Sequence, residues 1–102
     1  MEKNVKLSML LEIYKEMLTK KQADIIDLYY NQNLSLSEIA NDLSISRQAV
    51  RKSLVEAEKN LFMFEEKLKI LENKIKREEK IYKIINLLDD EKIIKMIEEL
   101  TE

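Results

Sequence analysis

The chain contains neither glycine nor proline in its 102 residues. Glycine supplies the positive φ angles that tight turns and phosphate-binding loops need, and proline interrupts helices. Without these two residues, the chain has few ways to turn sharply and nothing that breaks a helix. A β-rich fold and a glycine-rich nucleotide-binding loop are therefore disfavoured, and we predict an all-α protein.

Cysteine and histidine are absent as well. Their absence removes disulfides, thiolate nucleophiles, the commonest general base and the usual ligands of transition metals. No nucleophile–base pair is visible among the remaining residues. We therefore expect a protein that is not an enzyme and that needs no cofactor and no metal.

The length fits one domain, and we predict a single helical domain over residues 1–102. Hydrophobic residues make up 45% of the chain, which argues against disorder. No run of about 20 apolar residues suggests a membrane span, and the first residues do not resemble a signal peptide. We expect a cytoplasmic protein without a membrane span.

The net charge of −2 is unevenly distributed along the chain. Residues 46–60 carry four basic and two acidic side chains, and residues 67–83 carry seven basic and three acidic ones. Residues 84–102 carry a net charge of −4. A weakly acidic protein with basic middle segments can bind nucleic acid locally, although its overall field attracts a polyanion only weakly.

Capping signals divide the first half of the chain into short helices. Thr19 with Gln22, and Ser35 with Glu38, have the spacing of capping boxes, in which each side chain bonds the other residue's backbone N–H. The predicted helices are 5–18, 20–31 and 36–43, with a loop at 31–33. The apolar residues expected to face inward on the third helix are Ile39, Ala40 and Leu43.

A heptad seam begins at Val50 and alternates steps of four and three residues. Its members are Val50, Leu54, Ala57, Leu61, Phe64, Leu68, Leu71 and Ile75. This periodicity predicts one long helix over about 47–80, or two nearly continuous helices, roughly 50 Å in total length. So small a chain cannot cover such a helix alone, so part of the seam packs on another chain or on a folded-back tail.

The middle of the seam, Leu61 and Phe64, is expected to lie beyond the reach of a compact helix-turn-helix. Residues 61–102 are therefore predicted to form a long-helix extension with short C-terminal helices that drive self-association, and we expect a homodimer. The stretch after Asp89–Asp90 predicts a short amphipathic helix that this acidic pair caps.

Adjacent acidic residues occur as four pairs and raise the question of acid–base catalysis. The pairs are Glu65–Glu66, Glu78–Glu79, Asp89–Asp90 and Glu98–Glu99. Neighbouring side chains on a helix point about 100° apart, so such a pair does not converge on one atom. We expect these acids to face solvent or to cap helices.

Two capped helices with a short break between them have the spacing of a helix-turn-helix over residues 19–60. Ala40 is a small residue at the crossing of the two helices, and Val50, ten residues later, anchors the second helix to the core. Ser46 is a good N-cap for that second helix. With Val50 and Leu54 inward, the polar residues of its first two turns must face outward.

Those outward residues suit nucleic acid. Arginine can bond guanine O6 and N7, and glutamine can pair with adenine N6 and N7. The helix N-termini at Ser35 and Ser46 can offer backbone N–H groups to phosphates. The candidate nucleic-acid contacts are Ser35, Ser46, Arg47, Gln48, Arg51 and Lys52.

A structural interpretation stays open for the same residues. Helix-turn-helix units also serve as plain packing motifs, and basic residues on a long helix are usually a solvated face. Ser44 stands where such turns usually have glycine. A left-handed conformation there would cost on the order of 1 kcal/mol.

Four stretches of the chain together resemble the YlxM-type family of small bacterial proteins. They are Leu18–Gln22, Leu28–Tyr30, Leu34–Ala40 and Ile45–Val50. This family has a helix-turn-helix similar to region 4 of sigma factors, and the likeness covers roughly residues 5–75. It implies an all-helical protein from the operon context of the signal recognition particle, acting as a regulator or participant in that pathway. By match to the motif, Ser46, Arg47, Gln48, Arg51 and Lys52 would be the recognition-helix contacts.

Two functional hypotheses follow. The first is a DNA-binding regulator that takes part in the signal recognition particle pathway, with DNA favoured over RNA as the target. The second is a non-enzymatic accessory factor that binds the protein or the RNA of that particle. An exposed basic surface around Arg47 and Arg51 favours the first hypothesis, whereas salt bridges or a covering tail over these residues favour the second.

Overall fold

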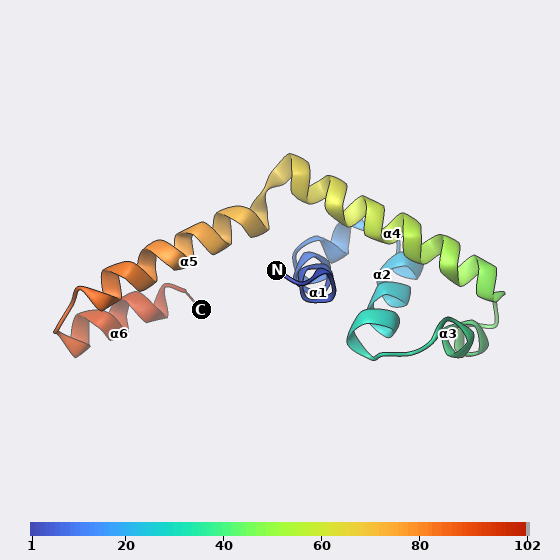
Figure 1. Cartoon of the computed structure of the whole chain (residues 1–102), viewed down its shortest axis with the longest axis horizontal. Helices are drawn as coiled ribbons and strands as arrows, with labels where there is room; N and C mark the ends of the chain where they lie inside the picture. The colour runs from blue at the N-terminus through green and yellow to red at the C-terminus, as the bar shows by residue number, and fades with distance from the viewer. Residues whose placement is uncertain (102) are drawn as a thin grey trace. The chain divides into compact units, whose positions relative to one another are not determined.

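The computed structural model describes residues 1–101, and these residues form helices and connecting turns without a strand. The all-α prediction is therefore confirmed (Figure 1). The α-helices are α1 Lys3–Tyr14, α2 Lys20–Ile26, α3 Leu36–Leu43, α4 Arg47–Leu68, α5 Ile70–Asn86 and α6 Glu91–Glu99. A 3₁₀ turn, Lys15–Met17, follows α1, and a π-helical segment, Asp27–Asn31, continues α2.

The chain divides into two compact units, Met1–Lys69 and Ile70–Glu102, here called unit 1 and unit 2. The sequence predicted one domain over 1–102, with its helix-turn-helix core ending near residue 60. The compact N-terminal unit reaches residue 69, because α1 packs against α4 together with α2 and α3.

Both predicted capping boxes are present at the starts of α2 and α3. The Thr19 hydroxyl accepts a hydrogen bond from the backbone N–H of Gln22 at 3.1 Å, and Ser35 does the same for Glu38 at 3.1 Å. Each box satisfies helix N–H groups that lack an intrahelical partner. These local bonds explain why α2 and α3 begin at the predicted residues.

Three residues in the described part of the chain have positive φ angles although none is glycine. They are Asn33, Ser44 and Lys69, with φ between 54° and 56°. A left-handed conformation costs a residue with a Cβ atom roughly 1–2 kcal/mol. The chain thus makes its sharp turns at polar residues that carry this cost.

Lys69 ends α4 inside the predicted seam. Its backbone N–H donates to the carbonyl of Glu65 at 2.8 Å, and its φ of 54° ends the right-handed helical conformation of α4. Of the two alternatives for residues 47–80, the structure therefore has two helices rather than one. The sequence contains no glycine, proline or capping motif at this position, so nothing local predicts the break.

The core of unit 1 is the apolar stripe of α4, which packs against α1, α2 and α3 (Figure 1). Its buried members are Val50, Leu54, Ala57 and Leu61. The fully buried side chains facing this stripe are Leu7, Leu10, Tyr14, Ile25, Ile26 and Ile39. Each fully buried aliphatic or aromatic side chain contributes about 1.5–3 kcal/mol, so this stripe holds unit 1 together.

The prediction that Leu61 and Phe64, beyond the reach of the helix-turn-helix, are left for a second chain to cover is wrong, because both pack within this chain. Leu61 is fully buried within the single chain. Tyr14 at the end of α1 places its ring 5.9 Å from the Phe64 ring and donates its hydroxyl to Glu65 at 2.7 Å. The seam as far as Phe64 is therefore intrachain core, and it gives no support to a dimer through these residues.

Two tyrosine–glutamate hydrogen bonds fix the far half of α4. Besides the bond from Tyr14 to Glu65, the Tyr30 hydroxyl donates to Glu58, which also lies 3.9 Å from the Lys3 ammonium. Burial and the bond to Glu58 raise the pKa of Tyr30 above its ordinary value. Glu65 was expected to face solvent, but it accepts a hydrogen bond from the core tyrosine.

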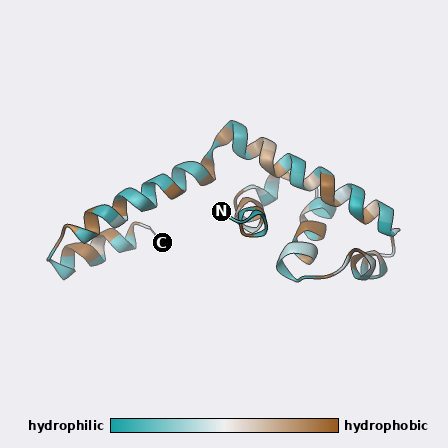
Figure 2. Ribbon diagram, viewed as in Figure 1, coloured by the Kyte–Doolittle hydropathy of each residue, from teal (hydrophilic) through white to brown (hydrophobic). Residues whose placement is uncertain are grey.

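Unit 2 is a pair of helices, α5 and α6, joined by residues 87–90 (Figure 1). Asp90 accepts hydrogen bonds from the backbone N–H groups of Lys92 and Ile93, which confirms the predicted acidic cap. Figure 2 shows hydrophobic residues recurring among hydrophilic ones along both helices. Leu71 is the one buried residue among 70–101.

The burial of Leu61 leads to a first prediction. Leu61→Ala should lower the free energy of unfolding by about 2–5 kcal/mol, because it leaves a cavity in the core of unit 1. The matched control is Leu68→Ala, at a seam position that is half exposed, where the loss should stay below about 1 kcal/mol. Denaturant unfolding measures both values, and equal losses at the two positions would contradict the structure.

The π-helical segment leads to a second prediction, because the side chains of Asn31 and Gln32 both donate to Asp27 and lower its pKa. A lowered pKa stabilises the fold above the unfolded-state value of 3.8, and this contribution is lost as pH falls through the folded-state value. Asp27→Asn should therefore destabilise the protein at about pH 7 and make progressively less difference below about pH 4. Thermal unfolding across this pH range measures the stability of the wild type and of Asp27→Asn. A stability difference between them that widens as the pH falls would contradict the lowered pKa of Asp27.

Candidate nucleic-acid interface

The turn between α3 and α4 has the geometry of a helix-turn-helix. Ala40 and Val50 are both buried, so the small residue and the anchor lie where the two helices meet the core. Ser44 has φ 55° and ψ 42°, and the N–H of Ile45 donates to the carbonyl of Ala40 at 3.1 Å. Ser44 thus takes the left-handed conformation that glycine usually supplies, and the turn closes as a Schellman motif.

Ser46 begins α4 by a side-chain cap. Its hydroxyl accepts a hydrogen bond from the backbone N–H of Ala49 at 3.0 Å. The next helical residues are Arg47 and Gln48, so their side chains project from the first turn. Because the positive end of a helix dipole lies at its N-terminus, an anion is favoured at this place.

The four long polar side chains of the predicted recognition surface are all exposed: Arg47, Gln48, Arg51 and Lys52. None of them forms a hydrogen bond or an ion pair with another side chain in residues 1–101. Residues 43–55 hold three basic residues and no acidic one. The beginning of α4 therefore carries a net positive charge at its surface, flanked by Asp42 and Glu56, with its opposite face buried.

Ser35 and Ser46 are both predicted phosphate contacts at helix N-termini, but the N-terminus of α3 differs from that of α4 in its hydrogen bonding. The backbone N–H of Ser35 donates to the Glu38 carboxylate at 3.0 Å, and the Ser35 hydroxyl accepts from Glu38 in return. This N–H is therefore already bonded, and a carboxylate lies beside it. A phosphate would meet repulsion at Ser35 and none at Ser46, where the cap contains no acidic residue.

Two basic residues that the sequence analysis missed lie beside the turn. Lys20 and Lys21, at the start of α2, line a recess together with Asp24, Leu43 and Ile45. The pair directly follows the Thr19 cap, and this position at the start of a predicted helix was the sequence signal that could have identified the two lysines as candidate contacts. The prediction that Leu43 faces the core is wrong: its side chain is 36% exposed, because it lies at this recess near the end of α3.

No group of three or more acidic side chains in residues 1–101 is placed to hold a metal ion. No helix in the same range is long and apolar enough to cross a bilayer.

The sequence of residues 1–100 matches the family described as "UPF0122: Putative helix-turn-helix protein, YlxM / p13 like". The chain belongs to this family. This is the family that the sequence motifs resemble, so that expectation is confirmed. The description of the UPF0122 family names a helix-turn-helix, which is the motif that α3 and α4 form in this chain.

Relatives of the chain carry the same family name. A UPF0122 protein of Clostridium kluyveri is 47% identical over 89 residues, covering 87% of this chain and 80% of the relative. One from Mycoplasma capricolum is 41% identical over 105 residues, covering 98% and 89%. One from Lactiplantibacillus plantarum is 38% identical over 104 residues, covering 97% and 90%. The similarity thus extends over both units of this UPF0122 family member.

The left-handed turn leads to a third prediction. Ser44→Gly should raise the free energy of unfolding by up to about 1 kcal/mol, and Ser44→Val should lower it by about 1–2 kcal/mol, because only glycine adopts this φ without steric cost. The matched control is Asn41→Gly, within the helical part of α3, which should not raise stability. Denaturant unfolding measures all three, and a destabilised Ser44→Gly variant would contradict the left-handed assignment.

Proposed function

We propose that this chain is a DNA-binding helix-turn-helix regulator that takes part in the signal recognition particle pathway. The observation that carries the proposal is the exposed, unpaired group Arg47, Gln48, Arg51 and Lys52 at the start of a helix whose other face is buried. An α-helix fits the major groove of B-form DNA, and this motif inserts the N-terminal part of its second helix. The link to the particle rests on the family resemblance alone.

The proposal gives the recognition residues two different roles. Arg47 and Gln48 lie in the first turn of α4, where side chains can reach base edges: arginine suits guanine, and glutamine suits adenine. Arg51 and Lys52 lie one turn later and are better placed for phosphates or the groove wall. The cap at Ser46 adds backbone N–H groups for a phosphate.

The surroundings of α4 supply further phosphate contacts in this proposal. Lys20 and Lys21 lie beside the turn that leads into α4, so they can extend the positive surface along the DNA backbone. Ser35 is the weakest of the predicted contacts, because the Glu38 carboxylate already occupies its N–H.

Duplex DNA is favoured over RNA on geometric grounds. The major groove of A-form RNA is too deep and narrow for side chains to read, and the beginning of α4 offers no aromatic surface on which single-stranded bases could stack. The proposed role requires no catalysis, cofactor or metal, and it places the protein in the cytoplasm, where bacterial DNA lies. We propose that the acting form is a homodimer.

A non-enzymatic accessory factor of the signal recognition particle is the second candidate. The net charge of −2 and the exposed apolar side chains of unit 2 favour a protein partner over a polyanion. This alternative does not explain why the basic residues of α4 are free of intrachain partners. In a scaffold role they would be expected in salt bridges.

The fourth prediction separates base reading from charge. Arg47→Ala should weaken binding to a selected duplex by about 1–3 kcal/mol and relax preference at one base position. Lys52→Ala should weaken binding to duplexes of all sequences similarly and reduce the slope of log affinity against log salt concentration by about one unit. Lys67→Ala is the matched control, because it removes one exposed charge about 22 Å further along α4, and it should change neither property.

The experiment is selection from random duplexes at moderate salt, followed by affinity measurements on the enriched site. If the wild type enriches no motif and Arg47→Ala still binds its cellular partner normally, the DNA proposal fails. Capture of partners from lysate with and without nuclease then tests the second candidate. A particle protein that is retained after nuclease treatment would support the accessory role.

A further inference from the structure

Unit 2 leaves much of its apolar surface uncovered. Among the most exposed side chains are Leu87 at 85%, Leu100 at 79% and Met96 at 64%. The others at least 44% exposed are Ile70, Tyr82, Ile84 and Ile93. Unit 1 has a closed core of its own, whereas unit 2 buries one residue among 70–101. A helical unit of about this size usually needs oligomerisation or another staple to be stable.

We infer that unit 2 is the dimerisation surface, on which the α5–α6 pair of one chain packs against the α5–α6 pair of a second copy. Such an interface is isologous, so one patch must be complementary to itself. Two features of unit 2 meet this requirement. They are a hollow with acidic edges and an opposite charge balance on the two halves of the unit.

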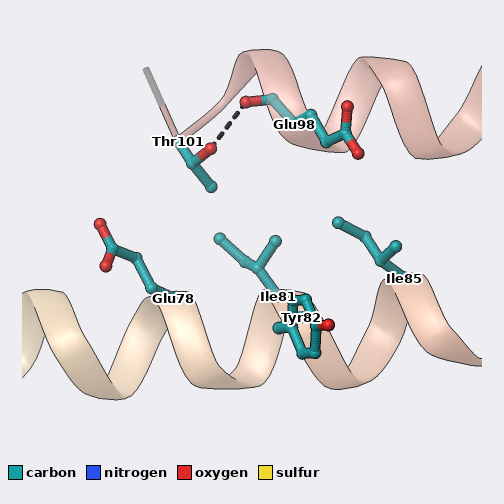
Figure 3. A pocket seen from close by; sticks show the side chains of 6 residues that line it. All are labelled: Glu78, Ile81, Tyr82, Ile85, Glu98 and Thr101. Atoms are coloured by element: carbon teal, nitrogen blue, oxygen red, sulfur yellow. Dashed lines mark hydrogen bonds between the residues drawn. The ribbon is translucent and has the colours of Figure 1, made fainter.

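The hollow lies between the two helices and measures about 320 Å³. In Figure 3, Ile81 and Ile85 point from α5 toward α6, and the α6 side of the hollow is formed by Glu98 and Thr101. The Thr101 hydroxyl is bonded to the backbone carbonyl of Glu98 at 2.7 Å, as the dashed line shows. The floor of the hollow is thus apolar, and no large apolar side chain of α6 fills it.

Two carboxylates, Glu78 from α5 and Glu98 from α6, line the same hollow. A long basic side chain suits such a place, because its aliphatic stem covers apolar surface while its charged end meets the carboxylates. α5 of a second copy offers Arg77, Lys80 and Lys83, whereas its Lys76 already pairs with Glu72 of the same helix at 3.3 Å. The chain therefore carries both the acidic hollow and the side chains that suit it.

The charge balance of unit 2 points to the same pairing. α5 carries five basic and three acidic residues, whereas residues 87–101 carry two basic and five acidic ones. Packing α5 of one chain on residues 87–101 of the other brings a net charge of +2 against −3, twice by symmetry, although α6 alone contributes only −1 of this. Packing α5 against α5, or residues 87–101 against residues 87–101, would bring charges of the same sign together and is disfavoured.

The test is the native mass in solution at micromolar concentration without nucleic acid. The wild type should have the mass of two chains. Met96→Glu and Leu100→Glu should each raise the dissociation constant at least about 100-fold, since an unpaired carboxylate would be buried in the interface. The matched control is Met17→Glu, which changes a 52% exposed methionine of unit 1 and should leave the protein dimeric.

A charge exchange tests the orientation and does not depend on apolar burial. One variant carries Lys80→Glu and Lys83→Glu, and the other carries Glu98→Lys and Glu99→Lys. Each should be mostly single-chain alone, and mixing them should restore a two-chain species, because each α5 then faces an oppositely charged α6. Circular dichroism of every variant checks that helix content is retained.

A wild type that stays single-chain through the micromolar range overturns the inference. So does a helical Met96→Glu variant that still pairs, or a mixture of the charge variants that fails to pair. A single-chain wild type that instead forms a complex with a signal recognition particle component would assign the surface to that partner. Because no DNA is present in these measurements, failure of the DNA proposal leaves their outcome unchanged.

Discussion

The buried stripe of α4 is the constraint on which the rest of unit 1 depends. Because Val50, Leu54, Ala57 and Leu61 follow the helical period, their burial fixes the rotation of the whole helix. That rotation turns Arg51 and its polar neighbours outward. The same contacts that stabilise the fold therefore create the exposed basic surface, and no separate feature is required to orient it.

Local hydrogen bonding explains which parts of the fold could be predicted. The capping boxes at Thr19 and Ser35 act within four residues, so the sequence alone locates the start of α3 and the cap of α2. The exposed and buried faces at the start of α4 follow from the same helical period. The four long side chains predicted to face outward, Arg47, Gln48, Arg51 and Lys52, are exposed, and nucleic-acid binding by the six candidate contacts stays a prediction.

Contacts between distant segments explain what could not be predicted. Nothing in the pattern of α4 says that Tyr14, some fifty residues earlier, packs on Phe64 and bonds Glu65. A seam looks the same whether its own chain or a partner covers it. The helix break at Lys69 could not be predicted for a different reason, since lysine is not a residue that usually adopts a left-handed conformation.

The net charge of the chain is a poor guide to its binding surface, because the acidic and basic residues are unevenly distributed along the chain. Glu38 occupies the N-terminus of α3, Glu58 and Glu65 accept tyrosine hydroxyls, and Asp27 accepts two side-chain amides. These carboxylates lie outside residues 43–55, where the three basic residues have no acidic neighbour in sequence. A protein with a slight negative charge can thus present a positive helix end, because the sign of the field that a ligand meets within about a Debye length depends on nearby groups. The same separation of charge recurs in unit 2 between α5 and residues 87–101, where it favours a second copy of the chain over a polyanion.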